Sequence, residues 1–205
     1  MAMAINLHVG DLPADVTFDG SVAIDSETMG LNPIRDRLCL VQMCGPDGEI
    51  HLVQFRRGEY DAPNLRRVLE DPAILKLFHF ARFDIAAMKA YLGVTTAPVY
   101  CTKIASKLTR TYTDRHGLKD LVRDLVGVEI SKQQQSSDWG AETLTPEQRE
   151  YAASDVRHLH KLKERFDILL AREGRTELAQ ACFDFLPSRA LLDLAGWPEQ
   201  DIFAH

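Results

Sequence analysis

The chain has 205 residues, of which 45% are hydrophobic, and a formal net charge of −6. These values suffice for one well-cored α/β domain, and because no apolar run approaches 18 residues we expect no membrane span. The charge argues against a protein that coats long nucleic acids through a basic surface. Four dispersed cysteines without a CxxC pair and no signal-peptide pattern favour a cytoplasmic protein with reduced thiols.

Strand-like runs come first along the chain, at residues 5–9, 21–25, 37–44 and 49–55. The "PDG" turn at 46–48 predicts that the last two form a hairpin. The pattern then predicts a helix at 62–71, a buried strand within 73–80, a helix at 81–93 ended by Gly93, and a short strand at 99–102. Two further helices are predicted around 103–108 and 117–126.

The best-marked helix follows a polar loop at 131–143. Thr145 can cap it, Pro146 occupies its first position and Gln148 completes a capping box. Its apolar face continues to about residue 173, and a last helical region at 176–195 is expected to be interrupted by Pro187. This order predicts an α/β fold, a mixed central sheet with helices on both faces, in a single domain over 1–205 with a core at about 20–170 and a helical tail at about 175–205.

Acidic residues recur at ordered positions. Asp25 and Glu27 share one face of a predicted strand, Asp84 lies near the start of a helix, and Tyr151 and Asp155 share a helix face at i, i+4. Each signal is weak alone, because such acids are also common on surfaces and at helix N-termini. Together they predict a site for two divalent ions, Mg²⁺ or Mn²⁺, which could activate water and stabilise the leaving oxygen of a phosphodiester.

The motifs "IDSET", "FHFARFD" and "YAASDVRHL" resemble those of the DEDD 3′–5′ exonucleases, in the ribonuclease D branch with tyrosine in the last motif. The segments "HGLKDL" and "QQSSDW" extend the match over about 20–165. Relatives often have asparagine after the histidine of the second motif, whereas Phe80 follows His79 here. The segments "TKIASKLTRTYTDRHGLK" and "FLPSRALLDLAGW" are similar to the nanoRNase C family of short alphaproteobacterial oligoribonucleases.

The resemblance implies a ribonuclease H-like (DnaQ-like) exonuclease fold. It implies that Asp25, Glu27, Asp84 and Asp155 hold two metal ions and that Tyr151 orients the attacking water. It also implies a homo-octamer that cleaves very short RNAs, notably dinucleotides such as pGpG, to nucleoside 5′-monophosphates. Longer RNA or DNA, including duplex ends, is the alternative substrate, and a catalytically dead RNA-binding scaffold is a third hypothesis that the complete set of acids disfavours.

For the substrate contacts the sequence leaves alternatives open. By the resemblance Leu31 is a wedge between two bases, with Met29 as a second candidate and Thr28 beside them; a loop-anchoring leucine is the alternative. His79 is equally well a substrate ligand or a satisfied core group. For the 5′ phosphate the sequence leaves three choices: the tip with Arg110, Arg115 and His116, the side chain of Lys103, or the loop with Gln133, Gln135 and Ser137.

Overall fold

The computed structural model describes residues 4–131 and 133–204; the predicted domain limits at 1 and 205 lie outside them. Its strands form one mixed sheet in the order β1-β4-β3-β2-β5-β6, in which β3 runs antiparallel to β2 and β4 and the other neighbours are parallel. The strands are β1 (Ile5–Val9), β2 (Ser21–Thr28), β3 (Leu38–Cys44), β4 (Ile50–Gln54), β5 (Leu75–Phe78) and β6 (Val99–Cys101).

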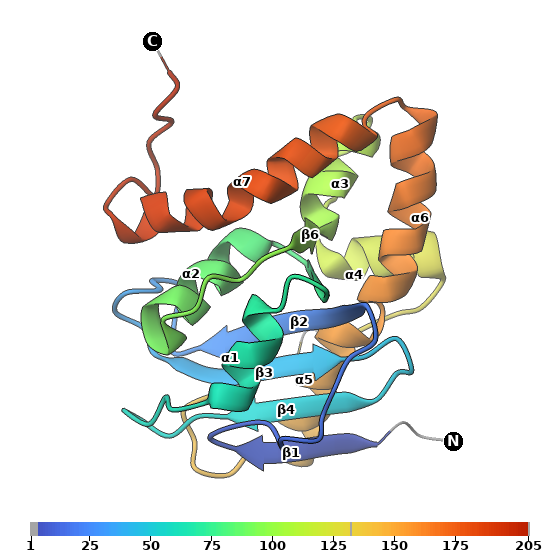
Figure 1. Ribbon diagram of the computed structural model, residues 1–205. Helices are drawn as coiled ribbons and strands as arrows, with labels where there is room; N and C mark the ends of the chain where they lie inside the picture. Colours follow the sequence, from blue (N-terminus) through green and yellow to red (C-terminus); the bar gives the residue numbers. More distant parts are fainter. Residues whose placement is uncertain (1–3, 132, 205) are drawn as a thin grey trace.

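The helices cover both faces of this sheet, as predicted. Figure 1 shows α1 on the near face, α5 behind the strands, and α7 lying along α2 above them. The helices are α1 (Pro63–Glu70), α2 (Ala81–Leu92), α3 (Thr102–Thr109), α4 (Leu118–Leu121), the π-helix η1 (Val122–Val126), α5 (Pro146–Arg157), α6 (Leu159–Arg172) and α7 (Thr176–Leu194).

The central strands carry the core and fix the place of the acidic residues. Every residue of β3 and β4 is buried, which fits strands covered on both faces. After Ser21, strand β2 contains the buried run Val22–Ile24 and then reaches Asp25 and Glu27. Because β2 lies between β3 and β5, these acids stand at the middle of the sheet.

Two local predictions are confirmed in detail. Strands β3 and β4 form the expected antiparallel pair across residues 45–49. Helix α5 carries the full capping box, in which the Gln148 amide N–H donates to Thr145 Oγ1 and the Thr145 N–H donates to Gln148 Oε1. The cap sets the first turn of α5, and with it the direction of Tyr151 and Asp155.

Two predictions about the C-terminal helices are wrong. The helix predicted to run from 146 to about 173 is divided at His158, so that α5 packs on the sheet while α6 turns away to pack along α3. Pro187 does not interrupt α7. A helical proline costs about 3 kcal/mol, but burial of Phe183 and Leu186 beside it stabilises the continuous helix by about 1.5–3 kcal/mol each.

All four cysteines are free thiols, as expected, and three of them are buried. Within residues 4–131 and 133–204, no helix combines the length and the apolar character needed to cross a membrane.

Candidate active site

Three carboxylates meet where β2 faces α5. Asp25 and Glu27 leave the same face of β2 because side chains alternate along a strand, and Asp155 comes from α5. Oxygen atoms of these three side chains all lie within 4.8 Å of one another. Clustered carboxylate oxygens are the ligands that hard divalent cations prefer.

Asp84 lies beside this trio rather than within it. It belongs to the first turn of α2, where the helix dipole favours an acid, and it is 3% exposed. The Ser26 hydroxyl donates a hydrogen bond of 2.6 Å to Asp84 Oδ1. The structure thus brings all four predicted acids to one place. Asp84 is held by its hydrogen bond to Ser26, the strand residue between Asp25 and Glu27.

The electrostatics of these acids fit a cation. Burial, followed by the charges of Asp84, Asp155 and Glu27, raises the pKa of Asp25 well above its usual range. Burial and the charges of Asp155 and Asp84 raise the pKa of Glu27 to about 9. Burial raises the pKa of Asp84 to about 7, although the Ser26 hydrogen bond opposes the shift. A divalent metal ion relieves this repulsion, so the donor set suits one.

Gln42 is a polar neighbour that the sequence analysis missed. It lies opposite Asp25 in the β2–β3 ladder and is fully buried. Its Nε2 is 3.4 Å from Asp25 Oδ2 and 3.5 Å from Glu27 Oε1, which makes both hydrogen bonds long. The register of the predicted hairpin relative to β2 would have been needed to find it.

Tyr151 stands over the acids from α5. Burial, then the charges of Asp155, Glu27 and Asp25, raises the pKa of its phenol above the ordinary value. The ring of Trp139 lies beside it, with centroids 5.9 Å apart. Trp139 is 3% exposed, so most of its indole ring is packed against other residues. Because its pKa is raised, the phenol of Tyr151 stays protonated at neutral pH and can donate a hydrogen bond.

A cleft of about 700 Å³ opens over these side chains. It is lined by the predicted residues Asp25, Glu27, Tyr151 and Asp155. Its walls also hold seven of the predicted substrate contacts, namely Thr28, Met29, Leu31, His79, Lys103, Gln135 and Ser137. Lys119, Phe80 and Phe83 line it as well, although none of them was predicted as a contact.

The loop after β2 presents its apolar residues to solvent. Leu31 is 89% exposed and Met29 is 50% exposed. The loop is braced by Asp36, whose Oδ2 accepts from the Asn32 N–H at 3.0 Å and whose Oδ1 accepts from Arg35 Nε at 2.7 Å. An anchoring leucine would be buried, so this placement favours the wedge hypothesis over the anchoring one.

His79 and Lys103 also line the cleft, from the turn between β5 and α2 and from α3. His79 Nδ1 is 2.9 Å from Thr102 Oγ1, which itself donates to the Phe78 carbonyl at 3.1 Å. Lys103 Nζ stands 4.1 Å from the centroid of the Phe80 ring. Burial lowers the pKa of this lysine.

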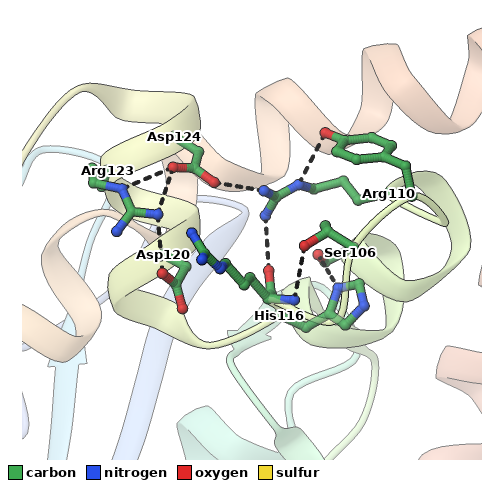
Figure 2. Close-up of polar contacts among 9 residues, drawn as sticks. Ser106, Arg110, His116, Asp120, Arg123 and Asp124 are labelled. Atoms are coloured by element: carbon green, nitrogen blue, oxygen red, sulfur yellow. Dashed lines mark hydrogen bonds and ion pairs between the residues drawn. The ribbon is translucent and has the colours of Figure 1, made fainter.

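The tip that precedes α4 does not line the cleft. Arg110 is 4% exposed, and its guanidinium donates to Asp124 Oδ2 at 2.6 Å and to the Arg115 carbonyl at 3.1 Å. Figure 2 shows the bond between Arg110 and Asp124 and the one between His116 and Ser106. His116 Nδ1 is 2.8 Å from Ser106 Oγ. In this chain Arg110, Arg115, His116 and, on the polar loop, Gln133 are thus all outside the cleft walls.

Comparison with known proteins identifies relatives of this chain. A 3′–5′ exonuclease family model matches residues 11–171. Ribonuclease D of Gluconacetobacter diazotrophicus is 35% identical over 156 residues, which cover 76% of this chain and 39% of that protein. The chain therefore spans about two fifths of the length of this relative.

Solved structures of Brucella melitensis NrnC match over the whole chain. The structure bound to pGG has a TM-score of 0.96 at 56% identity and covers 100% of both chains. The structure with bound Mg²⁺ has a TM-score of 0.95 at 55% identity, covering 99% of this chain and 100% of that one. Escherichia coli RNase D, with a TM-score of 0.73 at 23% identity over 83% of this chain and 45% of that one, shares the fold. The predicted ribonuclease H-like fold and the resemblance to ribonuclease D and nanoRNase C are confirmed.

Proposed function

Because this chain belongs to the 3′–5′ exonuclease family, we propose that it is a metal-dependent exoribonuclease that hydrolyses very short RNAs, above all dinucleotides such as pGpG, to nucleoside 5′-monophosphates. The observation that carries the proposal is the approach of the Asp25, Glu27 and Asp155 oxygens to within 4.8 Å of one another at the wall of the cleft. A structural relative that matches over the full chain is seen with pGG, which supports the short substrate.

Two divalent ions, Mg²⁺ or Mn²⁺, would be held by Asp25, Glu27 and Asp155, with Asp84 completing the set. Such ions would act as Lewis acids on a phosphoryl oxygen and would lower the pKa of a bound water. The Mg²⁺ found in the relative supports this assignment. Ser26 and Gln42 act behind the ligands by fixing the orientation of the carboxylates.

Tyr151 orients the attacking water and does not deprotonate it. Its pKa is raised by burial and by neighbouring acids, so its phenol is a hydrogen-bond donor and a poor base at neutral pH. Leu31 separates the two bases of the substrate, as its exposure above the cleft allows. Lys103, Lys119 and the Gln135–Ser137 side of the loop face the phosphates.

We further propose assembly into a homo-octamer, as the family resemblance implies. Exposed apolar side chains gather on α7 and in the tail after it, which supports burial against other copies. They are Leu178, Phe185, Leu191, Trp197, Ile202 and Phe203. Light scattering at micromolar protein concentration tests the assembly, and a monomeric mass would contradict it.

A length profile tests the activity. Rates are measured on a 5′-phosphorylated dinucleotide, a heptanucleotide and duplex DNA, each with Mg²⁺ and with EDTA. We expect cleavage that needs metal and is fastest on the dinucleotide; a flat profile would contradict specialisation, and fastest cleavage of duplex DNA would favour the alternative substrate. Asp155→Asn should abolish the activity, whereas the exposed Asp15→Asn serves as the matched control.

A further inference from the structure

Phe80 has a backbone conformation that its side chain disfavours. Its φ of 69° and ψ of 41° lie in the left-handed region, and among the described residues it is the only non-glycine residue with positive φ. In this region the Cβ of an L-residue crowds the following carbonyl, which is why glycine and asparagine predominate there. Phenylalanine therefore stabilises this position less than either of those residues would.

The path of the backbone explains why residue 80 has a left-handed conformation, but it does not explain why this residue is phenylalanine. Strand β5 ends at Phe78 and α2 begins at Ala81, so only two residues turn the chain and direct Asp84 toward the site. Glycine or asparagine would make this turn with less strain. Burial does not explain the ring either, because Phe80 is 46% exposed.

The ring of Phe80 lines the cleft that the proposed function assigns to the substrate. Phe80 lines the cleft that holds the carboxylates, and it also lines a neighbouring hollow of about 630 Å³. The two hollows share Leu31 and Phe83 as well, so Phe80 stands at the boundary between them. Lys103 Nζ lies over one face of the ring, 4.1 Å from its centroid.

We propose that Phe80 is a stacking platform for one nucleobase of the substrate, with Lys103 directed to a phosphate of the same nucleotide. The proposal rests on the proposed function, since it names how the substrate of that cleft is held. A strained residue with an exposed ring in a cleft is explained if the ring gains its favourable contacts only when a base is bound. Stacking on an aromatic side chain tolerates any base, so the proposal requires no particular base sequence in the substrate.

The test uses Phe80→Asn, which removes the ring but suits the left-handed conformation, and Phe80→Tyr, which keeps a ring. A stacked base is worth about 1–3 kcal/mol, so Phe80→Asn should raise the KM for a 5′-phosphorylated dinucleotide by about 5- to 150-fold. Phe80→Tyr should restore most of the loss. The melting temperature of Phe80→Asn should be unchanged or higher, because strain is relieved.

Abasic substrates provide the decisive comparison. When the base that stacks is absent, wild type and Phe80→Asn should have equal KM values; removal of the other base should leave their difference intact. If the difference persists for both abasic dinucleotides, the proposal is overturned. A lower melting temperature together with losses on every substrate would show a structural role instead.

A binding measurement separates this proposal from the proposed function. Quenching of a 2-aminopurine dinucleotide is titrated against Asp155→Asn protein, with and without Phe80→Asn. Quenching that requires Phe80 supports stacking. If wild type nevertheless cleaves none of the RNAs, only the proposed function is contradicted. Equal quenching in both proteins, with cleavage by wild type intact, would remove stacking alone.

Discussion

The Ser26 hydroxyl donates a hydrogen bond of 2.6 Å to Asp84 Oδ1, and this bond joins β2 to α2 across 58 residues of sequence. Both residues are buried. The bond lowers the pKa of Asp84 and so opposes the effect of burial, which keeps the carboxylate easier to ionise. Ser26 is the middle residue of the "DSE" motif, and its hydroxyl is the group that binds Asp84.

Ser26→Ala should weaken the response to metal more than it weakens the fold. Without the hydroxyl the pKa of Asp84 rises further above about 7, so a larger fraction is protonated at neutral pH. Partners that orient metal ligands typically contribute about 10- to 100-fold to metal affinity. The Mg²⁺ concentration for half-maximal dinucleotide cleavage should rise about 10-fold or more. Ser21→Ala, on the same strand and bonded to His160, is the matched control and should leave this value unchanged.

Metal-free protein should lose stability as the pH rises. The folded-state pKa values of Glu27, about 9, and Asp84, about 7, lie above unfolded values of about 4. The folded state therefore binds more protons, so the stabilising contribution is complete below about pH 4 and is lost as the pH rises through 7 and 9. With EDTA present, the free energy of unfolding should fall by up to about 1.4 kcal/mol per pH unit for each group, as measured by chemical denaturation.

Two comparisons sharpen that measurement. Added Mg²⁺ should restore more stability at pH 9 than at pH 5, because ionised carboxylates bind it better. Glu27→Gln should make the metal-free pH dependence shallower. An identical slope in this variant, or a stability that increases with pH in EDTA, would refute the assigned electrostatics.

Local sequence rules predicted what depends on neighbouring residues. The capping box at Thr145, the end of α2 at Gly93 and the hairpin of β3 and β4 follow from residues within a few positions of one another. The helix break at His158 and the continuity of α7 through Pro187 do not, because packing against α3 and α2 decides them. Tertiary burial outweighs local preference there.

The residues of the candidate site also differ in whether local sequence rules predict them. The acids were predictable because strand periodicity places Asp25 and Glu27 on one face of β2, and helix periodicity places Asp155 on the same face of α5 as Tyr151. The basic residues were not, since a run of cations does not show which of them is buried and paired with an acid. Arg110 is bonded to Asp124, whereas Lys119, from the same basic segment, lines the cleft.

Arg110→Met should reduce stability and leave substrate affinity intact. The variant keeps most of the side-chain volume but removes the bonds to Asp124 and to the Arg115 carbonyl, at a cost of about 2 kcal/mol in the free energy of unfolding. The exposed Arg115→Met is the matched control, with a change within about 0.5 kcal/mol. An increased KM for the dinucleotide in folded Arg110→Met, with stability unchanged, would show that the tip binds substrate instead.

Gln148 links the cap of α5 to the cleft loop, so two substitutions in the capping box should differ in effect. Thr145→Ala removes only the hydroxyl that accepts the Gln148 N–H, and should lower the free energy of unfolding by about 1 kcal/mol and the melting temperature by about 2–4 °C. Gln148→Met keeps that bond, because the backbone N–H makes it, but removes the side-chain oxygen that accepts from the Thr145 N–H. It also removes the side-chain donor to Ser137 Oγ, at 2.7 Å, and to the Asp138 carbonyl, at 3.1 Å.

Gln148→Met should therefore raise the KM for the dinucleotide as well, because Ser137 and Trp139 line the cleft. Thr145→Ser, which keeps the hydroxyl, is the control for the cap. Thermal melts and initial rates of all three variants, compared below the lowest melting temperature, separate the two effects. If Thr145→Ala and Gln148→Met raised KM equally, the cap alone would position the loop, and the side-chain amide of Gln148 would have no separate role.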